Sequence, residues 1–303
     1  MLVGEMRKKN KYSINLRMLI GQDLAYMEKE DLLSLFKNLL LRARDQDDFI
    51  EILYAMCEVG SAKFRILVRG LRNILERHIR LMGLDRMKMV LLYVSRTSPG
   101  CFKALLDQFG DIIHDILVDG HFNDIIILIL NMSILNEESA IMFVDAMRDT
   151  IRELAMTEGF KHFGTVLWYI TIMKKPNVAK KLFSVLLDII SGKTSSLTDL
   201  ADMLFWLVKG DENLGVYGAE LLKDRILSLL EKASIPDIAG FLLITSKHEK
   251  LFNKIWGIIN PQLARILDRG DLRDRLQALL STLKVEIPLK DIQRSLPYQH
   301  TGK

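Results

Sequence analysis

Residues 61–80 read SAKFRILVRGLRNILERHIR, residues 99–118 read PGCFKALLDQFGDIIHDILV, and residues 137–156 read EESAIMFVDAMRDTIRELAM. Large apolar residues recur at equivalent positions in these three stretches and in a fourth, residues 176–191, at spacings of 38, 38 and 39 residues. The three aligned columns are Leu67, Leu105, Phe143 and Leu182; Leu71, Phe109, Met147 and Leu186; and Leu75, Ile113, Ile151 and Ile190. Columns that keep step in this way predict a repeated amphipathic helix.

A second, more apolar helix is predicted after each of these first helices. Its first large apolar residue recurs at gaps of 38, 35, 41, 37 and 38 residues, at Phe49, Met87, Phe122, Phe163, Leu200 and Ile238. Helix pairs at this period predict an all-α fold, a right-handed α-solenoid (superhelix) of about seven helix-hairpin repeats of ~37 residues.

The expected helix boundaries follow from the same periodicity. The first helices are expected at 28–43, 61–80, 99–118, 137–156, 176–191, 212–233 and 248–268, and the second helices at 46–59, 84–96, 121–134, 159–174, 196–209, 236–246 and 271–283. We expect a single domain over 1–285, with a capping segment that includes a helix at 12–27, and a partly disordered tail over 286–303.

Turn and cap residues agree with these boundaries. Pro99, Pro176 and Pro236 fall at expected helix starts, where a missing N–H costs little, and Ser98 is an expected N-cap. Ser196 with Asp199 resembles a capping box. Pro261 lies inside an expected helix and should kink or split it.

The paired helices over about residues 28–283 resemble the HEAT and armadillo class of α-solenoid. The resemblance rests on repeat length and helix pairing. It implies an elongated scaffold with a docking role, and it assigns no activity and no site residue to this chain.

The composition favours an intracellular, cytoplasmic protein without a membrane span. Apolar residues are 49% of the 303, yet the longest apolar run in the middle of the chain is only Ile125 to Leu130, whereas a spanning helix needs roughly 20 residues. The N-terminal stretch lacks an apolar core of signal-peptide length. Two cysteines, Cys57 and Cys101, do not build a disulfide framework.

The net charge of +4 conceals two opposite blocks. Residues 61–103 hold ten Lys/Arg and two Asp/Glu, and residues 104–160 hold two Lys/Arg and eleven Asp/Glu. One interpretation is an anion-binding patch for nucleic acid or an acidic protein, formed by Arg65, Arg69, Arg72, Arg77 and Arg80. The other is lateral ion pairing between repeats, because one repeat takes Arg69 to Asp107 and Arg77 to Asp115.

The second helices carry large apolar residues on most of their sides. Two explanations stay open: a tightly packed layer, or a groove that a partner fills. If a groove exists, its expected anchors are the aromatic residues Tyr54, Tyr93, Trp168, Tyr169 and Trp206.

No motif predicts catalysis, a metal or a cofactor. Ser191 to Ser195 (SGKTS) resembles the end of a phosphate-binding loop but lacks the earlier glycine, and the histidines show no zinc-ligand spacing. Asp111, His114 and Asp115 share part of one helical face, but a lone group of this kind on an exposed helix is usually solvated and does not predict a metal site.

We therefore expect a non-catalytic scaffold or adaptor that docks a protein or peptide partner. The alternative is a nucleic-acid-binding solenoid that uses the basic block at 61–103. This alternative includes a base-excision enzyme resembling the alkylpurine DNA glycosylases, with aromatic residues that stack on a nucleotide beside Asp199 or Asp202. A further alternative is a self-assembling structural protein, a homo-oligomer in which the basic block of one copy meets the acidic block of another.

Overall fold

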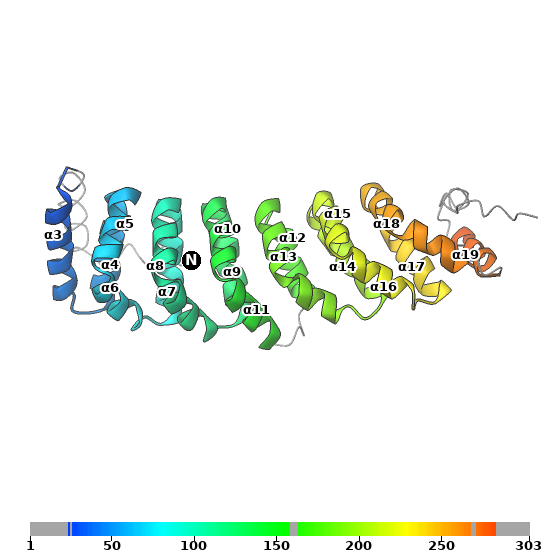
Figure 1. Cartoon of the computed structure of the whole chain (residues 1–303), viewed down its shortest axis with the longest axis horizontal. Coiled ribbons are helices and arrows are strands. Elements are labelled where there is room, and N and C mark those ends of the chain that lie inside the picture. Colours follow the sequence, from blue (N-terminus) through cyan, green and yellow to red (C-terminus); the bar gives the residue numbers. More distant parts are fainter. Residues whose placement is uncertain (1–23, 25, 158–162, 268–270, 283–303) are drawn as a thin grey trace, which may run out of the picture. The chain divides into compact units, whose positions relative to one another are not determined.

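The computed structural model describes residues 24, 26–157, 163–267 and 271–282, and within this part all the regular structure is α-helical (Figure 1). The all-α prediction is thus confirmed. The helices are α3 (Lys29–Arg42), α4 (Gln46–Glu58), α5 (Ser61–Gly70), α6 (Arg72–Ile79), α7 (Leu84–Thr97), α8 (Pro99–Val118), α9 (Phe122–Leu135), α10 (Glu137–Ala146), α11 (Arg148–Thr157), α12 (Phe163–Ile172), α13 (Pro176–Lys193), α14 (Leu197–Gly210), α15 (Glu212–Leu221), α16 (Lys223–Leu230), α17 (Ile235–Thr245), α18 (Glu249–Leu267) and α19 (Asp271–Thr282).

The chain divides into two compact units, Met1–Leu154 and Ala155–Lys303. In the first unit, the first helices of successive pairs pack side by side: α3 on α5, α5 on α8, and α8 on α10. The second helices do the same, α4 on α7 and α7 on α9. Each helix pair therefore covers the apolar side of the next pair, which is the packing that a repeated hairpin requires.

The second unit follows the same rule. Its first helices pack as α13 on α15 and α15 on α18, and its second helices as α12 on α14, α14 on α17 and α17 on α19. This packing is compatible with a helical-repeat architecture in each unit. The superhelix, its handedness, the number of repeats and the single domain stay predictions.

The three apolar columns form the core, as the sequence predicts. All twelve side chains, from Leu67 to Ile190, are buried. A fully buried side chain of this size contributes about 1.5–3 kcal/mol relative to an exposed one. Within the first unit, the helices that carry these columns pack side by side, α5 on α8 and α8 on α10.

Three expected first helices are broken, and this corrects the prediction. The expected helix 61–80 is α5 and α6, 137–156 is α10 and α11, and 212–233 is α15 and α16. The residues at the breaks are Leu71, Met147 and Leu222, whose ψ angles are 15°, 21° and 10°. All three are buried and apolar, so the periodic pattern runs through each break. No proline lies at any of the three, and Gly70 stands immediately before the first.

Pro261 does not split its helix, since α18 continues from Glu249 to Leu267. The ring removes the N–H that would bond to the carbonyl of Gly257. Both residues are exposed, so water can satisfy that carbonyl. Most of the expected capping helix at 12–27 and the tail at 286–303 lie outside the described residues.

The expected helix caps are formed. The Ser98 hydroxyl accepts a hydrogen bond from the N–H of Cys101, and Ser196 and Asp199 form a capping box at the start of α14. A second box that the sequence analysis did not identify, Ser234 with Asp237, starts α17. Asp199 Oδ2 accepts from the N–H of Ser195 and of Ser196, each at 2.9 Å. Burial alone would raise the pKa of Asp199, but these hydrogen bonds outweigh it and lower the pKa.

We expect Asp199→Asn to lower the free energy of unfolding by about 1 kcal/mol near pH 7, because the charged cap at the helix N-terminus is lost. The folded pKa lies below the unfolded value of about 3.9. The carboxylate therefore stabilises the fold above that value, and its contribution falls as the pH drops through the folded pKa. Urea unfolding of both proteins between neutral and acidic pH measures this, and a difference that stays constant at every pH would contradict it.

Candidate docking surfaces

The aromatic patch consists of Trp168, Tyr169, Phe205, Trp206 and Lys209, on α12 and α14 of the second unit. The two helices approach closely where Thr171 meets Gly210, since a Cβ built on Gly210 would lie 2.7 Å from Thr171 Cα. Trp168 precedes Thr171 by three residues, and Trp206 precedes Gly210 by four, so each indole lies about one turn from this contact. The patch therefore joins neighbouring second helices.

Both indoles are open to solvent. Trp168 is 48% exposed and Trp206 is 40% exposed, whereas the inner side chains Leu167 and Leu207 are buried. The question that the sequence left open is answered for these two residues: their rings are not core. An indole offers roughly 150–250 Å² when fully buried, so each ring keeps a large area that a partner could cover.

Lys209 adds a charge that the sequence analysis did not single out. Its Nζ lies 4.7 Å from the ring centroid of Phe205 and 4.8 Å from that of Trp206. Attraction to the two ring faces holds the ammonium at the edge of the patch. The signal was present in the sequence, because Lys209 follows these residues by four and three positions on one helix.

The tyrosines of the first unit lie differently. Tyr54 is 6% exposed and stacks on Tyr93 with ring centroids 3.6 Å apart and planes inclined by 20°. The half-buried Tyr93 donates a hydrogen bond of 2.9 Å to Glu58. The pair joins α4 to α7, and the burial of Tyr54 favours a structural role in the core.

We expect Tyr54→Ala to lower the free energy of unfolding by about 3–5 kcal/mol, the cost of deleting a buried aromatic ring. Trp206→Ala should cost only about 1 kcal/mol, because much of that ring is already in water. Denaturant unfolding of the two variants, monitored by far-UV circular dichroism, gives the comparison. Equal losses of stability would contradict the different roles assigned to the two rings.

The basic stripe consists of Arg65, Arg69, Arg72 and Arg77, which are exposed along α5 and α6. Among the described residues, none of the four takes part in an ion pair. The expected lateral pairs of Arg69 with Asp107 and of Arg77 with Asp115 are therefore not formed. Arg80 contacts Asp115 instead, at 3.8 Å, and also bonds to Glu76 at 2.9 Å.

Lateral ion pairs do form between other helices. Arg86 pairs with Asp47 at 3.2 Å and Lys88 with Asp124 at 3.1 Å, in both cases between neighbouring second helices. Hydrogen bonds to Asp85 and to Asp124 raise the pKa of the Lys88 ammonium. Within the described residues, part of the basic block thus forms ion pairs, whereas the four arginines of the basic stripe do not.

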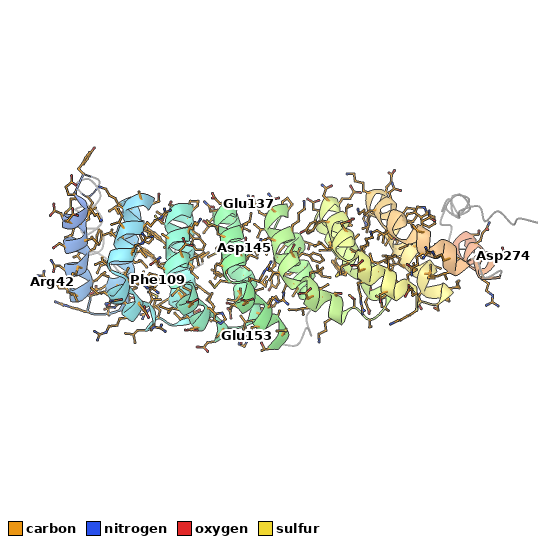
Figure 2. The ribbon with its side chains drawn as sticks, viewed as in Figure 1. Arg42, Phe109, Glu137, Asp145, Glu153 and Asp274 are labelled. Carbon is orange, nitrogen blue, oxygen red and sulfur yellow. The ribbon has the colours of Figure 1, made fainter. Side chains whose placement is uncertain are left out.

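The acidic stripe lies next to the basic stripe, on the following first helices of the first unit. Its members are exposed at intervals of four residues: Asp107, Asp111 and Asp115 on α8, then Asp145, Asp149 and Glu153 on α10 and α11. Figure 2 labels Asp145 on α10 and Glu153 on α11, and Arg42 on α3. Within the first unit, the surface that the first helices present is thus basic over α5 and α6 and acidic over α8, α10 and α11.

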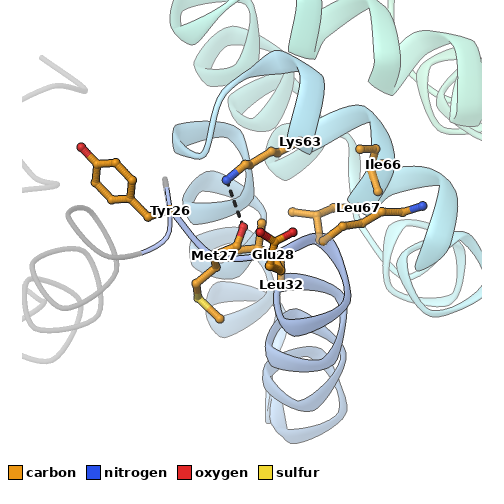
Figure 3. Close-up of a pocket in the computed structure, with 8 residues that line it drawn as sticks. Tyr26, Met27, Glu28, Leu32, Lys63, Ile66 and Leu67 are labelled. Carbon is orange, nitrogen blue, oxygen red and sulfur yellow. Dashed lines mark hydrogen bonds between the residues drawn. The ribbon is translucent and has the colours of Figure 1, made fainter.

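A cavity of about 300 Å³ lies beside α3 and α5 (Figure 3). Its lining includes Tyr26, Leu32 and Lys63. The Lys63 ammonium donates hydrogen bonds to the carbonyls of Leu24 and Met27, at 3.4 and 3.2 Å. This charge therefore holds the segment before α3 against α5.

Metal-ligating and thiol side chains are the last group of candidates among the described residues. No cluster of His, Cys, Asp and Glu among them could hold a metal ion, and His114 instead bonds to Thr150 at 2.6 Å. Burial raises the pKa of the Cys57 thiol, and the neighbouring Cys101 is completely buried. Within the same part of the chain, no helix combines the length and apolar character that crossing a membrane requires.

Comparisons of the chain with protein families, characterised proteins and solved structures find no match.

Proposed function

We propose that this protein is a non-catalytic helical-repeat scaffold, a right-handed α-solenoid of about seven hairpins, that docks a protein or peptide partner on the aromatic patch. The observation that carries the proposal is the exposure of Trp168 and Trp206 on adjacent helices. Tryptophan is among the residues that most often dominate the binding energy at protein interfaces. We also propose a cytoplasmic location, because the cytosol keeps thiols reduced and Cys57 and Cys101 are both free thiols.

The composition of the patch indicates which partner it fits. The indoles offer apolar area, and Tyr169 and Phe205 extend it on either helix. Lys209 places a positive charge at the edge. A segment with a large apolar residue beside Asp or Glu would bury its side chain on the rings and place its carboxylate near the ammonium.

A selection from a displayed random peptide library tests the proposal. We expect enriched peptides to combine an apolar anchor with a neighbouring acidic residue. Trp206→Ala should weaken their binding by about 2 kcal/mol, roughly 30-fold in Kd, because it removes a central anchor. Lys209→Gln should weaken the binding of acidic peptides more than the binding of their neutral analogues. Fluorescence polarisation measures each Kd.

The control is Leu81→Ala, which truncates an exposed apolar side chain outside the patch. It should leave the Kd unchanged, and all variants should keep the wild-type circular dichroism spectrum. Failure to enrich any sequence, or peptides that bind Trp206→Ala as well as wild type, would refute docking at the aromatic patch.

Nucleic-acid binding is the second candidate, and the unpaired arginines of the basic stripe favour it. The acidic stripe opposes it, since a phosphate backbone laid across both stripes would be repelled. Base excision has weaker support, because one oxygen of Asp199 is already occupied by donors from Ser195 and Ser196. A gel-shift assay at low salt, with wild type and with Arg69→Glu, decides whether the arginines retain duplex or single-stranded DNA.

A further inference from the structure

The charged surface of the first unit is self-complementary, because it carries exposed cations and exposed anions on neighbouring helices. Arg69 and Arg72 are exposed on α5 and α6, and both helices pack against α8, which exposes Asp107 and Asp111. Neighbouring helices lie about 8–10 Å apart, so cations and anions form parallel stripes at that separation. None of these four residues forms an ion pair among the described residues.

We propose that this surface binds a second copy of the same chain, in a dimer with two-fold symmetry. The axis would run parallel to the helices, between the basic stripe and the acidic stripe. A half-turn about it places each basic stripe opposite the acidic stripe of the other copy and leaves the helix direction unchanged. A two-fold interface uses the same patch on both copies, and this patch supplies both signs of charge.

The repeat register fixes which residues meet. Arg69 and Asp107 are one repeat of 38 residues apart, so they lie at the same level on adjacent helices. The half-turn preserves this level and brings Arg69 of each copy to Asp107 of the other. Arg72, which lies one position from the level of Asp111, meets that residue in the same way. Each contact occurs twice in the dimer.

A long polyanion fits this surface less well than a second copy does. A nucleic acid that followed the row of first helices would pass from the arginines onto Asp107 and Asp111, and then onto Asp145 and Asp149. A second copy instead satisfies both signs at once. The inference does not depend on the aromatic patch, which belongs to the other unit.

The test measures the mass of the full-length protein by sedimentation equilibrium over a concentration series. We expect a dimer that is at least tenfold weaker at about 0.5 M salt than at about 0.05 M, because the Debye length falls well below 10 Å. Arg69→Glu with Arg72→Glu should give a monomer, and so should Asp107→Arg with Asp111→Arg. In each variant, like charges face one another across the axis.

A mixture of the two charge-reversed variants is the decisive arm. One variant then has acidic residues in both stripes and the other has basic residues in both, so the mixture should form a heterodimer with opposite charges across the axis. The control for the arginine reversal is Arg96→Glu with Lys247→Glu, which makes the same change in net charge as that variant at exposed positions outside both stripes and should dimerise as wild type does.

Three outcomes would overturn the proposal: a wild-type monomer at every concentration in low salt, a dimer that survives both charge reversals, or a mixture that stays monomeric. A wild-type monomer whose duplex DNA binding is abolished by the arginine reversals would assign the basic stripe to phosphate instead. Circular dichroism of each variant confirms that it is folded. Peptide binding at the aromatic patch is measured separately, so its success or failure leaves this test unaffected.

Discussion

Within each unit, the structure depends on the burial of every helix's apolar side against the helix pair that follows it. The column of Leu67, Leu105 and Phe143 shows the arrangement, because all three side chains are buried and their helices, α5, α8 and α10, pack in succession. If a neighbouring helix pair were removed, the helix packed against it would expose its apolar side to water. The sides that neighbouring pairs do not cover remain available as surface, and both candidate docking surfaces lie there.

Polar interactions complete this packing at the helix ends and flanks. Capping boxes start α14 and α17, and ion pairs such as Lys88 with Asp124 join neighbouring second helices. Exposed pairs of this kind contribute about 0–1 kcal/mol each, so apolar burial supplies most of the stability. Their effect is to favour one alignment between neighbouring helices, since each pair forms only when its two partners lie at the same level.

The two surfaces differ in the physics that would drive binding. The aromatic patch offers apolar area with one fixed cation, which suits a short segment held by a few anchors. The charged surface of the first unit offers stripes of opposite sign, whose attraction weakens with salt and selects a partner by its pattern. A chain with both surfaces could present a bound segment in two copies, which would strengthen its hold on a partner with repeated motifs.

Periodicity alone determined the helical class, the core columns and most helix starts, because a buried stripe constrains residue type at every turn. It did not reveal the breaks at Leu71, Met147 and Leu222, because a buried apolar residue satisfies the pattern with either backbone geometry. The sequence identified Tyr54 and Trp206 as equal candidates for a groove. The tertiary structure separated them, since exposure is decided by which neighbouring helix covers a ring. Likewise, the charges were read from the sequence, but the arginines left without an ion pair were revealed only by the distances between adjacent helices.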